Sequence, residues 1–233
     1  MLGIVSFLTD LSSEAIFAVL PVFMTAVLGA STLLLGTMEG LADFAASSLD
    51  LASGYASDRL GKRKGLAVLG YGLSSAAKTV LVFAATAGQV FAFRVVERLG
   101  KSIRGAPRDA LLAGVAPKET RGTSFGLHKA LDKAGAIAGP LVAFALLDRF
   151  GQSLESFRRL FLFAIVPAFA SVLVLVLFVP ERKAAGKKRV PLREAIRTLG
   201  PGYRHYLISA GIFSAAYFSY AFLLLAAARA HFE

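Results

Sequence analysis

Long apolar segments alternate with short polar stretches along almost the whole chain. Seven of these segments are apolar on nearly every side, unlike soluble helices, which show one apolar stripe. They predict helices over about Gly3–Leu28, Thr32–Ser57, Gly65–Ala87, Gln89–Gly114, Gly122–Leu147, Leu160–Val179 and His205–Ala228. Because about 20 apolar residues cross a hydrocarbon core about 30 Å thick, we predict an all-α fold: a polytopic bundle of membrane helices in a lipid bilayer.

Composition agrees with this pattern. The 233 residues are 56% hydrophobic, with a mean hydropathy of +0.64, whereas soluble domains are usually about 45–50% apolar. The formal net charge of +11 would favour a nucleic-acid partner in a soluble protein, but most of the excess lies between the apolar segments. We therefore predict no nucleic-acid partner.

Lys and Arg residues concentrate in every second loop. The loops after the first, third and fifth predicted helices carry only Arg149, Arg158 and Arg159. The loops after the second, fourth and sixth are strongly basic, with Arg59, Lys62, Arg63, Lys64, Lys118, Arg121, Arg182, Lys183, Lys187, Lys188, Arg189, Arg193 and Arg197. Since basic loops stay in the cytoplasm, we predict a multi-pass protein of the cell membrane with a cytoplasmic N-terminus.

Enzyme and metal motifs are missing from the sequence. No cysteine is present, which excludes a thiolate metal site. Gly100-Lys101-Ser102 would need a glycine where Val95 stands to be a phosphate loop, and no HExxH motif occurs. We predict no enzyme activity, no metal and no cofactor. The first apolar segment lacks a basic start and carries Asp10, so we do not expect a cleaved signal peptide.

The stretch from Gly54 to Lys64 fits the pattern G-x-x-x-D-R-x-G-[RK]-R. Gly54 favours close helix packing, Gly61 favours a tight turn, and Asp58 suits an arginine or a helix N-terminus. With this loop between its second and third predicted helices, the chain resembles the major facilitator superfamily. The resemblance implies a conformational-gate motif formed by Gly54, Asp58, Arg59, Gly61 and Arg63.

Two further helices add to the resemblance, which covers essentially the whole chain. The fourth predicted helix loosely resembles the arginine- and glycine-bearing fourth helix of the superfamily, although its spacing is unusual. Gly135, Gly139 and Pro140 resemble a glycine-proline motif that many exporters carry in helix five. The runs from Glu14 to Leu28 and from Gly100 resemble a bacterial subgroup of unknown substrate.

The superfamily has two six-helix halves that handle substrate between them. The resemblance therefore implies a six-helix N-terminal half over residues 1–180, a basic cytoplasmic linker over 181–203, and a seventh transmembrane helix over 204–233. A missing C-terminal half, or a second chain, is the implied partner.

Charged residues inside the apolar segments need partners, because a charge near the bilayer centre costs about 2.5 kcal/mol or more. They concentrate in the first, second, fourth and fifth predicted helices, whereas the third carries only Lys78. The resemblance places helices one, four and five around the cavity and helix three further out. Helices rise about 1.5 Å per residue, and this rise places six charged residues near mid-membrane: Glu14, Asp43, Arg98, Lys101, Asp132 and Lys133. Because opposite charges occur at the same depth, we predict ion pairs between helices.

We predict that Glu14, Arg98, Lys101 and Asp132 form a central proton- or substrate-coupling group. Secondary candidates are Asp10, Glu39, Asp43, Arg94 and His128. Two interpretations stay open. A carboxylate such as Glu14 or Asp132 exchanges a proton when the cavity opens, or the charges are fixed pairs that hold helices together. His128 suits a proton carrier or a packed, hydrogen-bonded residue.

The sequence thus predicts a secondary active transporter of a small solute. A proton-coupled exporter that works by antiport and alternating access fits best, and export rests on the helix-five motif alone. The basic charge of the fourth helix is compatible with an anionic substrate. The alternative is a non-transporting, truncated or split half that needs a partner half.

Overall fold

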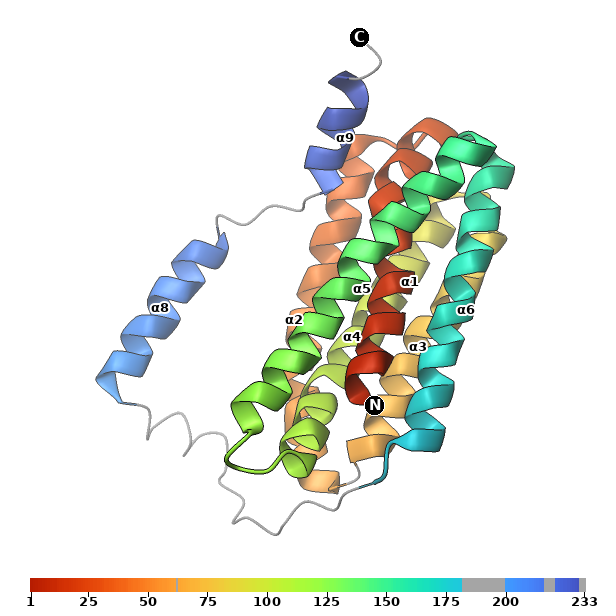
Figure 1. Cartoon of the computed structure of the whole chain (residues 1–233). Coiled ribbons are helices and arrows are strands. Elements are labelled where there is room, and N and C mark those ends of the chain that lie inside the picture. The colour runs from red at the N-terminus through yellow and green to blue at the C-terminus, as the bar shows by residue number, and fades with distance from the viewer. Residues whose placement is uncertain (62, 182–199, 216–220, 231–233) are drawn as a thin grey trace.

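The computed structural model describes residues 1–61, 63–181, 200–215 and 221–230, and its elements in these ranges are helices (Figure 1). The first helix, α1, is followed by a short π-helical segment, η1. The bounds are Leu2–Val22 (α1), Phe23–Val27 (η1), Thr32–Leu60 (α2), Arg63–Val82 (α3), Ala87–Val115 (α4), Arg121–Phe150 (α5), Leu154–Phe178 (α6), Pro201–Ala215 (α8) and Ala221–Ala230 (α9).

The six long helices α1 to α6 pack side by side in one bundle (Figure 1). Helix α1 packs along α5 and α6, while α4 packs along α2 and α3, and α3 also contacts α6. The bundle therefore sets α1 and α5 opposite α2 and α4, and these four helices surround the site described below.

Small residues allow the closest helix contacts. A Cβ atom built on Gly135 of α5 would lie 3.0 Å from Cα of Phe7 in α1, and one on Gly139 would lie 2.7 Å from the backbone nitrogen of Ala15. Gly70 of α3 and Gly100 of α4 meet in the same way, because a Cβ on either would lie within 2.7 Å of the other's carbonyl oxygen. These glycines permit backbone-to-backbone packing inside the bundle.

Local signals explain where the helices begin and end. Side chains of Ser31, Thr86 and Ser153 accept hydrogen bonds from backbone N–H groups in the first turns of α2, α4 and α6. The predicted start of the sixth helix at Leu160 was wrong: α6 begins at Leu154, because the Ser153 cap stabilises a polar first turn that hydrophobicity alone excludes. Gly61 ends α2 in the left-handed conformation, with φ of 65°.

Pro21 lies inside α1 without ending it. The helix continues into η1, where Thr25 Oγ1 donates a hydrogen bond of 2.9 Å to the Pro21 carbonyl oxygen. A π-helical turn after a proline accommodates the lost backbone donor. The predicted first helix, Gly3–Leu28, is thus one continuous element, as α1 and η1 together.

Four described helical segments are long and apolar enough to cross a membrane: Leu2–Val27, Arg63–Val82, Arg121–Phe150 and Leu154–Phe178. Helices α2 and α4 have 29 residues each and are long enough to cross a membrane, but with their charged residues they are not apolar enough to count among these segments. The seventh predicted span is described as two shorter helices, α8 with 15 residues and α9 with 10. Most of the predicted linker over 181–203 lies outside the described residues.

Apolar side chains cover the outside of the bundle as well as its core. Phe23, Phe157 and Phe161 pack in the core, with ring centroids 5.1 and 5.2 Å from Phe23. On α6, large apolar side chains such as Phe163 and Leu173 are exposed. A helix that is apolar on its buried and exposed sides suits lipid rather than water.

Candidate functional site

A cavity of about 880 Å³ opens between α1, α2, α4 and α5. Its described lining carries six basic side chains and four acidic ones, which is unusual in a bundle with an apolar exterior. The basic ones are Arg98, Lys101, Arg104, Arg108, Lys129 and Lys133, and the acidic ones are Asp10, Asp43, Asp50 and Asp132. Phe213 and Ser214 of α8 also reach the lining.

Arg98 of α4 pairs with Asp43 of α2 across the cavity. The Arg98 Nη2 and Asp43 Oδ1 atoms are 3.1 Å apart, and both side chains are partly exposed. Matching the two residues by depth in the membrane predicted an ion pair at this level, and the structure confirms it. The pair joins α2 to α4 at the cavity wall.

Asp132 of α5 lies among basic groups in the same cavity. Arg108 Nη1 is 3.8 Å from Asp132 Oδ1, and Lys129 Nζ is 3.7 Å from Asp132 Oδ2. Arg108 also donates a hydrogen bond of 3.0 Å to Asp109 from its Nε atom. Asp10 of α1 belongs to the lining of the same cavity.

The predicted central group of four is therefore only partly assembled. Arg98, Lys101 and Asp132 line the cavity, whereas Glu14 does not belong to its lining. Among the described residues, Glu14 forms no hydrogen bond or ion pair. Asp10, which the sequence ranked as secondary, lines the cavity together with Asp132.

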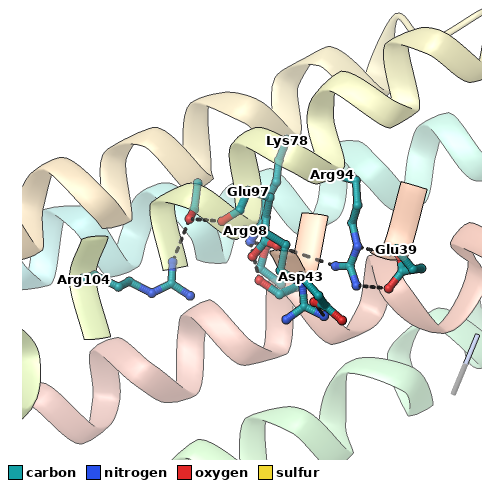
Figure 2. A network of polar contacts seen from close by, with 10 residues as sticks. Glu39, Asp43, Lys78, Arg94, Glu97, Arg98 and Arg104 are labelled. Atoms are coloured by element: carbon teal, nitrogen blue, oxygen red, sulfur yellow. Dashed lines mark hydrogen bonds and ion pairs between the residues drawn. The ribbon is translucent and has the colours of Figure 1, made fainter. Parts of the chain in front are cut away.

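A buried ion pair joins α2 and α4 in the N-terminal part of α4 (Figure 2). Arg94 donates from Nε and Nη2 to the two carboxylate oxygens of Glu39 in α2, both at 2.7 Å. The Arg94 side chain is 2% exposed, and its guanidinium lies 4.1 Å from the ring centroid of Phe17. Its Nη1 atom is 3.6 Å from the buried carboxylate of Glu97. This bidentate arrangement fixes α2 against α4.

Lys78 of α3 is the functional candidate that the sequence missed (Figure 2). Its side chain is fully buried, and its Nζ donates hydrogen bonds to the hydroxyls of Ser12 and Ser13 in α1, at 2.7 and 2.9 Å. The Ser12 hydroxyl donates in turn to the Ala164 carbonyl oxygen of α6. Helix three was expected further out, yet Lys78 links three helices at the bundle centre. A single charge in an apolar helix gives no sign of which side it faces.

Arg104 of α4 is buried at the α3–α4 contact. Its Nη1 donates a hydrogen bond of 2.8 Å to Ser74, and its guanidinium lies 4.5 Å from the ring centroid of Tyr71. The Ser74 hydroxyl donates onward to the backbone oxygen of Glu97. These contacts hold Arg104 at the cavity edge.

The predicted gate motif occupies the turn between α2 and α3. Asp58 lies 4.0 Å from Arg63, whose Nη1 also donates a hydrogen bond of 3.2 Å to the Ala110 carbonyl oxygen of α4. Gly61 supplies the left-handed turn, as predicted. A Cβ on Gly54 would lie 3.7 Å from that of Ala106, which is ordinary contact with α4. Arg59 is exposed at the end of α2.

In the helix-five motif, Gly135 and Gly139 face α1, and Pro140 follows within the unbroken helix α5. His128 is buried, with Nε2 3.0 Å from the Ser6 hydroxyl oxygen. Its Nδ1 has no hydrogen-bond partner among the described residues. The contact fits the packed, hydrogen-bonded interpretation of this histidine.

A metal centre has no counterpart in the described part of the chain. No three His, Cys, Asp or Glu residues gather there in a way that could hold a metal ion.

Comparisons with known proteins agree on one family. The model of the Major Facilitator Superfamily matches residues 2–232. An uncharacterised MFS-type transporter of Methanocaldococcus jannaschii is 37% identical over 227 residues, which cover 97% of this chain and 56% of the relative. The multidrug resistance protein MdtH of Cronobacter sakazakii is 29% identical over 57% of this chain and 33% of its own length.

Solved structures show the same fold. A POT family transporter in complex with a thioalcohol-conjugated peptide superposes with a TM-score of 0.70 at 17% identity, over 99% of this chain and 46% of the other. A bacterial homologue of the human lysosomal transporter Spinster, inward-facing and occupied, gives 0.68 at 17%, over 81% and 45%. The chain thus spans about half the length of these transporters. It is a multi-pass membrane protein and belongs to the Major Facilitator Superfamily.

Proposed function

We propose that this chain forms the N-terminal, cavity-lining part of a proton-coupled secondary transporter for a small solute, working by alternating access. The observation that carries the proposal is the concentration of charge in one cavity. Ten charged side chains face a space of about 880 Å³ inside a bundle that is apolar outside. Because charges at membrane depth are expensive, such a cavity suits a solute or ion pathway better than a purely structural core.

Proton coupling is supported by the carboxyl groups of this cavity. Asp10 and Asp132 lie on α1 and α5, and both face basic groups of α4 or α5. Carboxyl groups in a cavity that alternately opens to either side of the membrane exchange protons with each side in turn. No nucleotide-binding motif accompanies them in the sequence, which leaves a gradient as the driving force.

The net charge of the cavity lining supports a substrate class. Six basic and four acidic side chains give the described lining an excess of two positive charges (6 − 4 = 2). Arg98 and Arg108 are engaged in ion pairs, whereas Lys101 and Lys133 form no ion pair among the described residues. A small solute with an anionic group is therefore our proposed substrate class.

We place the protein in the cell membrane with the N-terminus in the cytoplasm, on the distribution of Lys and Arg in the loops. Export in exchange for protons is the direction we propose. It is supported by the helix-five glycine-proline motif and by the name of the related multidrug resistance protein. In the structure the two motif glycines serve the α1–α5 contact.

The test uses the product of the complete reading frame that encodes this chain, reconstituted in liposomes. A pH gradient is imposed, and movement of protons and of candidate anionic solutes is followed together. We expect solute flux that depends on the gradient and proton movement that depends on the solute. Folded protein that moves neither under a gradient of either sign would overturn the proposal and favour the alternative of a non-transporting half.

A further inference from the structure

Two arginines one turn apart on α4 pair with two carboxylates one turn apart on α2, but the two ion pairs differ (Figure 2). Arg94 donates to both carboxylate oxygens of Glu39 at 2.7 Å, and these side chains are 2% and 7% exposed. The closest atoms of Arg98 and Asp43, Nη2 and Oδ1, are 3.1 Å apart, and these side chains are 21% and 44% exposed. The second pair is therefore open to whatever enters the cavity, whereas the first is closed.

The guanidinium of Arg98 has hydrogen-bonding capacity that Asp43 leaves unused. An arginine side chain offers five N–H donors in a planar fork, which matches a carboxylate with two parallel hydrogen bonds. Among the described residues, Asp43 is the ion-pair partner of Arg98, and the buried Nε atom of Arg98 has no acceptor. Arg98 can therefore bind a carboxylate more completely than it binds Asp43.

The packing of α2 on α4 does not depend on the Arg98–Asp43 pair. The buried Arg94 pair lies one turn before it on α4. One turn after it, the Ser102 hydroxyl donates to the Ala46 carbonyl oxygen at 2.9 Å, and the Ser53 hydroxyl donates to the Ser102 carbonyl oxygen at 2.8 Å. Because contacts on both sides hold the helices together, this pair can open without separating them. An Asp43 carboxylate released from the pair stays solvated, since it is already exposed.

The cavity also provides space and a second cation beside the pair. Gly40 lies three residues before Asp43 on the same side of α2 and lines the cavity, and a Cβ built on it would meet no atom within 4 Å. Lys101 lies three residues after Arg98 on α4 and lines the same cavity. It forms no ion pair among the described residues. A small anionic group that enters at Gly40 is therefore attracted by both cations.

We propose that Arg98 is the binding site for a carboxylate group of the solute, and that Asp43 occupies this site when no solute is bound. The solute carboxylate takes the place of Asp43, forms two hydrogen bonds to the guanidinium, and is attracted by the charge of Lys101. A solute without a carboxylate cannot displace Asp43, so the internal pair selects for this group. The role of the site in transport rests on the proposed function, whereas carboxylate binding at Arg98 does not.

Modification of arginine side chains by phenylglyoxal, mapped by mass spectrometry of the complete protein in detergent micelles, tests this site without a transport assay. Benzoate serves as the carboxylate probe. We expect Arg98 to react and the buried Arg94 to stay unmodified, and benzoate to slow the reaction of Arg98. In Asp43→Asn, the benzoate concentration that halves the reaction rate should fall about two- to five-fold, because an exposed ion pair no longer competes.

Two glycines of the cavity provide matched variants that keep every charge. Gly40→Leu fills the space beside the pair and should raise the benzoate concentration needed. Gly105→Leu also projects into open space of the cavity, but it lies about 10 Å along α4 from Arg98 and should leave that concentration unchanged. Circular dichroism checks that each variant is folded.

The proposal is overturned if Arg98 reacts no faster than Arg94, if benzoate does not protect Arg98, or if Asp43→Asn needs as much benzoate as the unmodified protein. Equal effects of Gly40→Leu and Gly105→Leu would also overturn it. Protection by benzoate without any solute flux would reject the proposed function and keep the carboxylate site. Proton-driven flux of a carboxylate that Arg98→Gln leaves unchanged would reject the site and keep the function.

Discussion

The contact between α1 and α5 depends on Gly135, and replacing this glycine by alanine should loosen it. A Cβ there would lie 3.0 Å from Cα and 3.1 Å from the carbonyl carbon of Phe7, and closer still to the Phe7 carbonyl oxygen. All three are backbone atoms, so no side-chain rotation can make room. The two helices must therefore move apart to make room for the added Cβ.

Comparison with a matched variant gives the free-energy cost of this clash. Overpacking of this kind costs about 1–3 kcal/mol, while Gly to Ala in a helix interior returns about 0.5–1 kcal/mol. Gly72 lies inside α3, and a Cβ there would meet no atom within 4 Å. Gly72→Ala therefore keeps the helical gain without the clash. The difference in unfolding free energy between the two variants isolates the clash, about 1–3 kcal/mol.

Denaturant titration in detergent micelles, followed by far-ultraviolet circular dichroism, measures this difference. The chain contains no tryptophan, so helix content is a better signal than intrinsic fluorescence. We expect the Gly72→Ala protein to be the more stable of the two variants. Equal stability, or a more stable Gly135→Ala protein, would refute the close packing of α1 on α5.

Three more outcomes follow from the buried charges. Glu39→Leu should destabilise the protein by about 3–5 kcal/mol, and Arg94→Met should cost more in the same titration, because Glu39 and Glu97 then both lose a buried cationic neighbour. Lys78→Met should change stability by less than about 1 kcal/mol, since Ser12 still donates to the Ala164 carbonyl, and a loss above about 3 kcal/mol would assign Lys78 an essential charge.

Much of the helical scaffold could be predicted from hydrophobic runs, because the bilayer fixes their length. The positions of the helix ends were predicted less accurately. Hydrophobicity starts the sixth helix at Leu160, whereas the Ser153 cap starts it at Leu154. Apolar length also overstated the uniformity of the bundle, since α2 and α4 carry too much charge to qualify as apolar spans.

The site was predictable along the membrane normal but not around each helix. Depth placed Arg98 and Asp43 together correctly, because rise per residue is constant. It could not tell that Glu14 lies off the cavity while Asp10, one turn earlier, faces it. The direction of the Lys78 side chain could not be predicted for the same reason, because it depends on how α3 is rotated against α1. Side-chain direction is a property of the packed bundle.

We expect the charged cavity to be an aqueous pathway that opens to each side of the membrane in turn. Ser47 lines the cavity, and Leu173 lies on the exposed apolar face of α6. In a background without other cysteines, Ser47→Cys and Leu173→Cys are treated with a membrane-impermeant thiol reagent from either side. We predict that the thiol at position 47 reacts from one side at rest and from the other under an opposed pH gradient, while the thiol at position 173 stays unreactive. A thiol at position 47 that reacts from neither side, or no faster than the one at position 173, would contradict an aqueous pathway through the cavity.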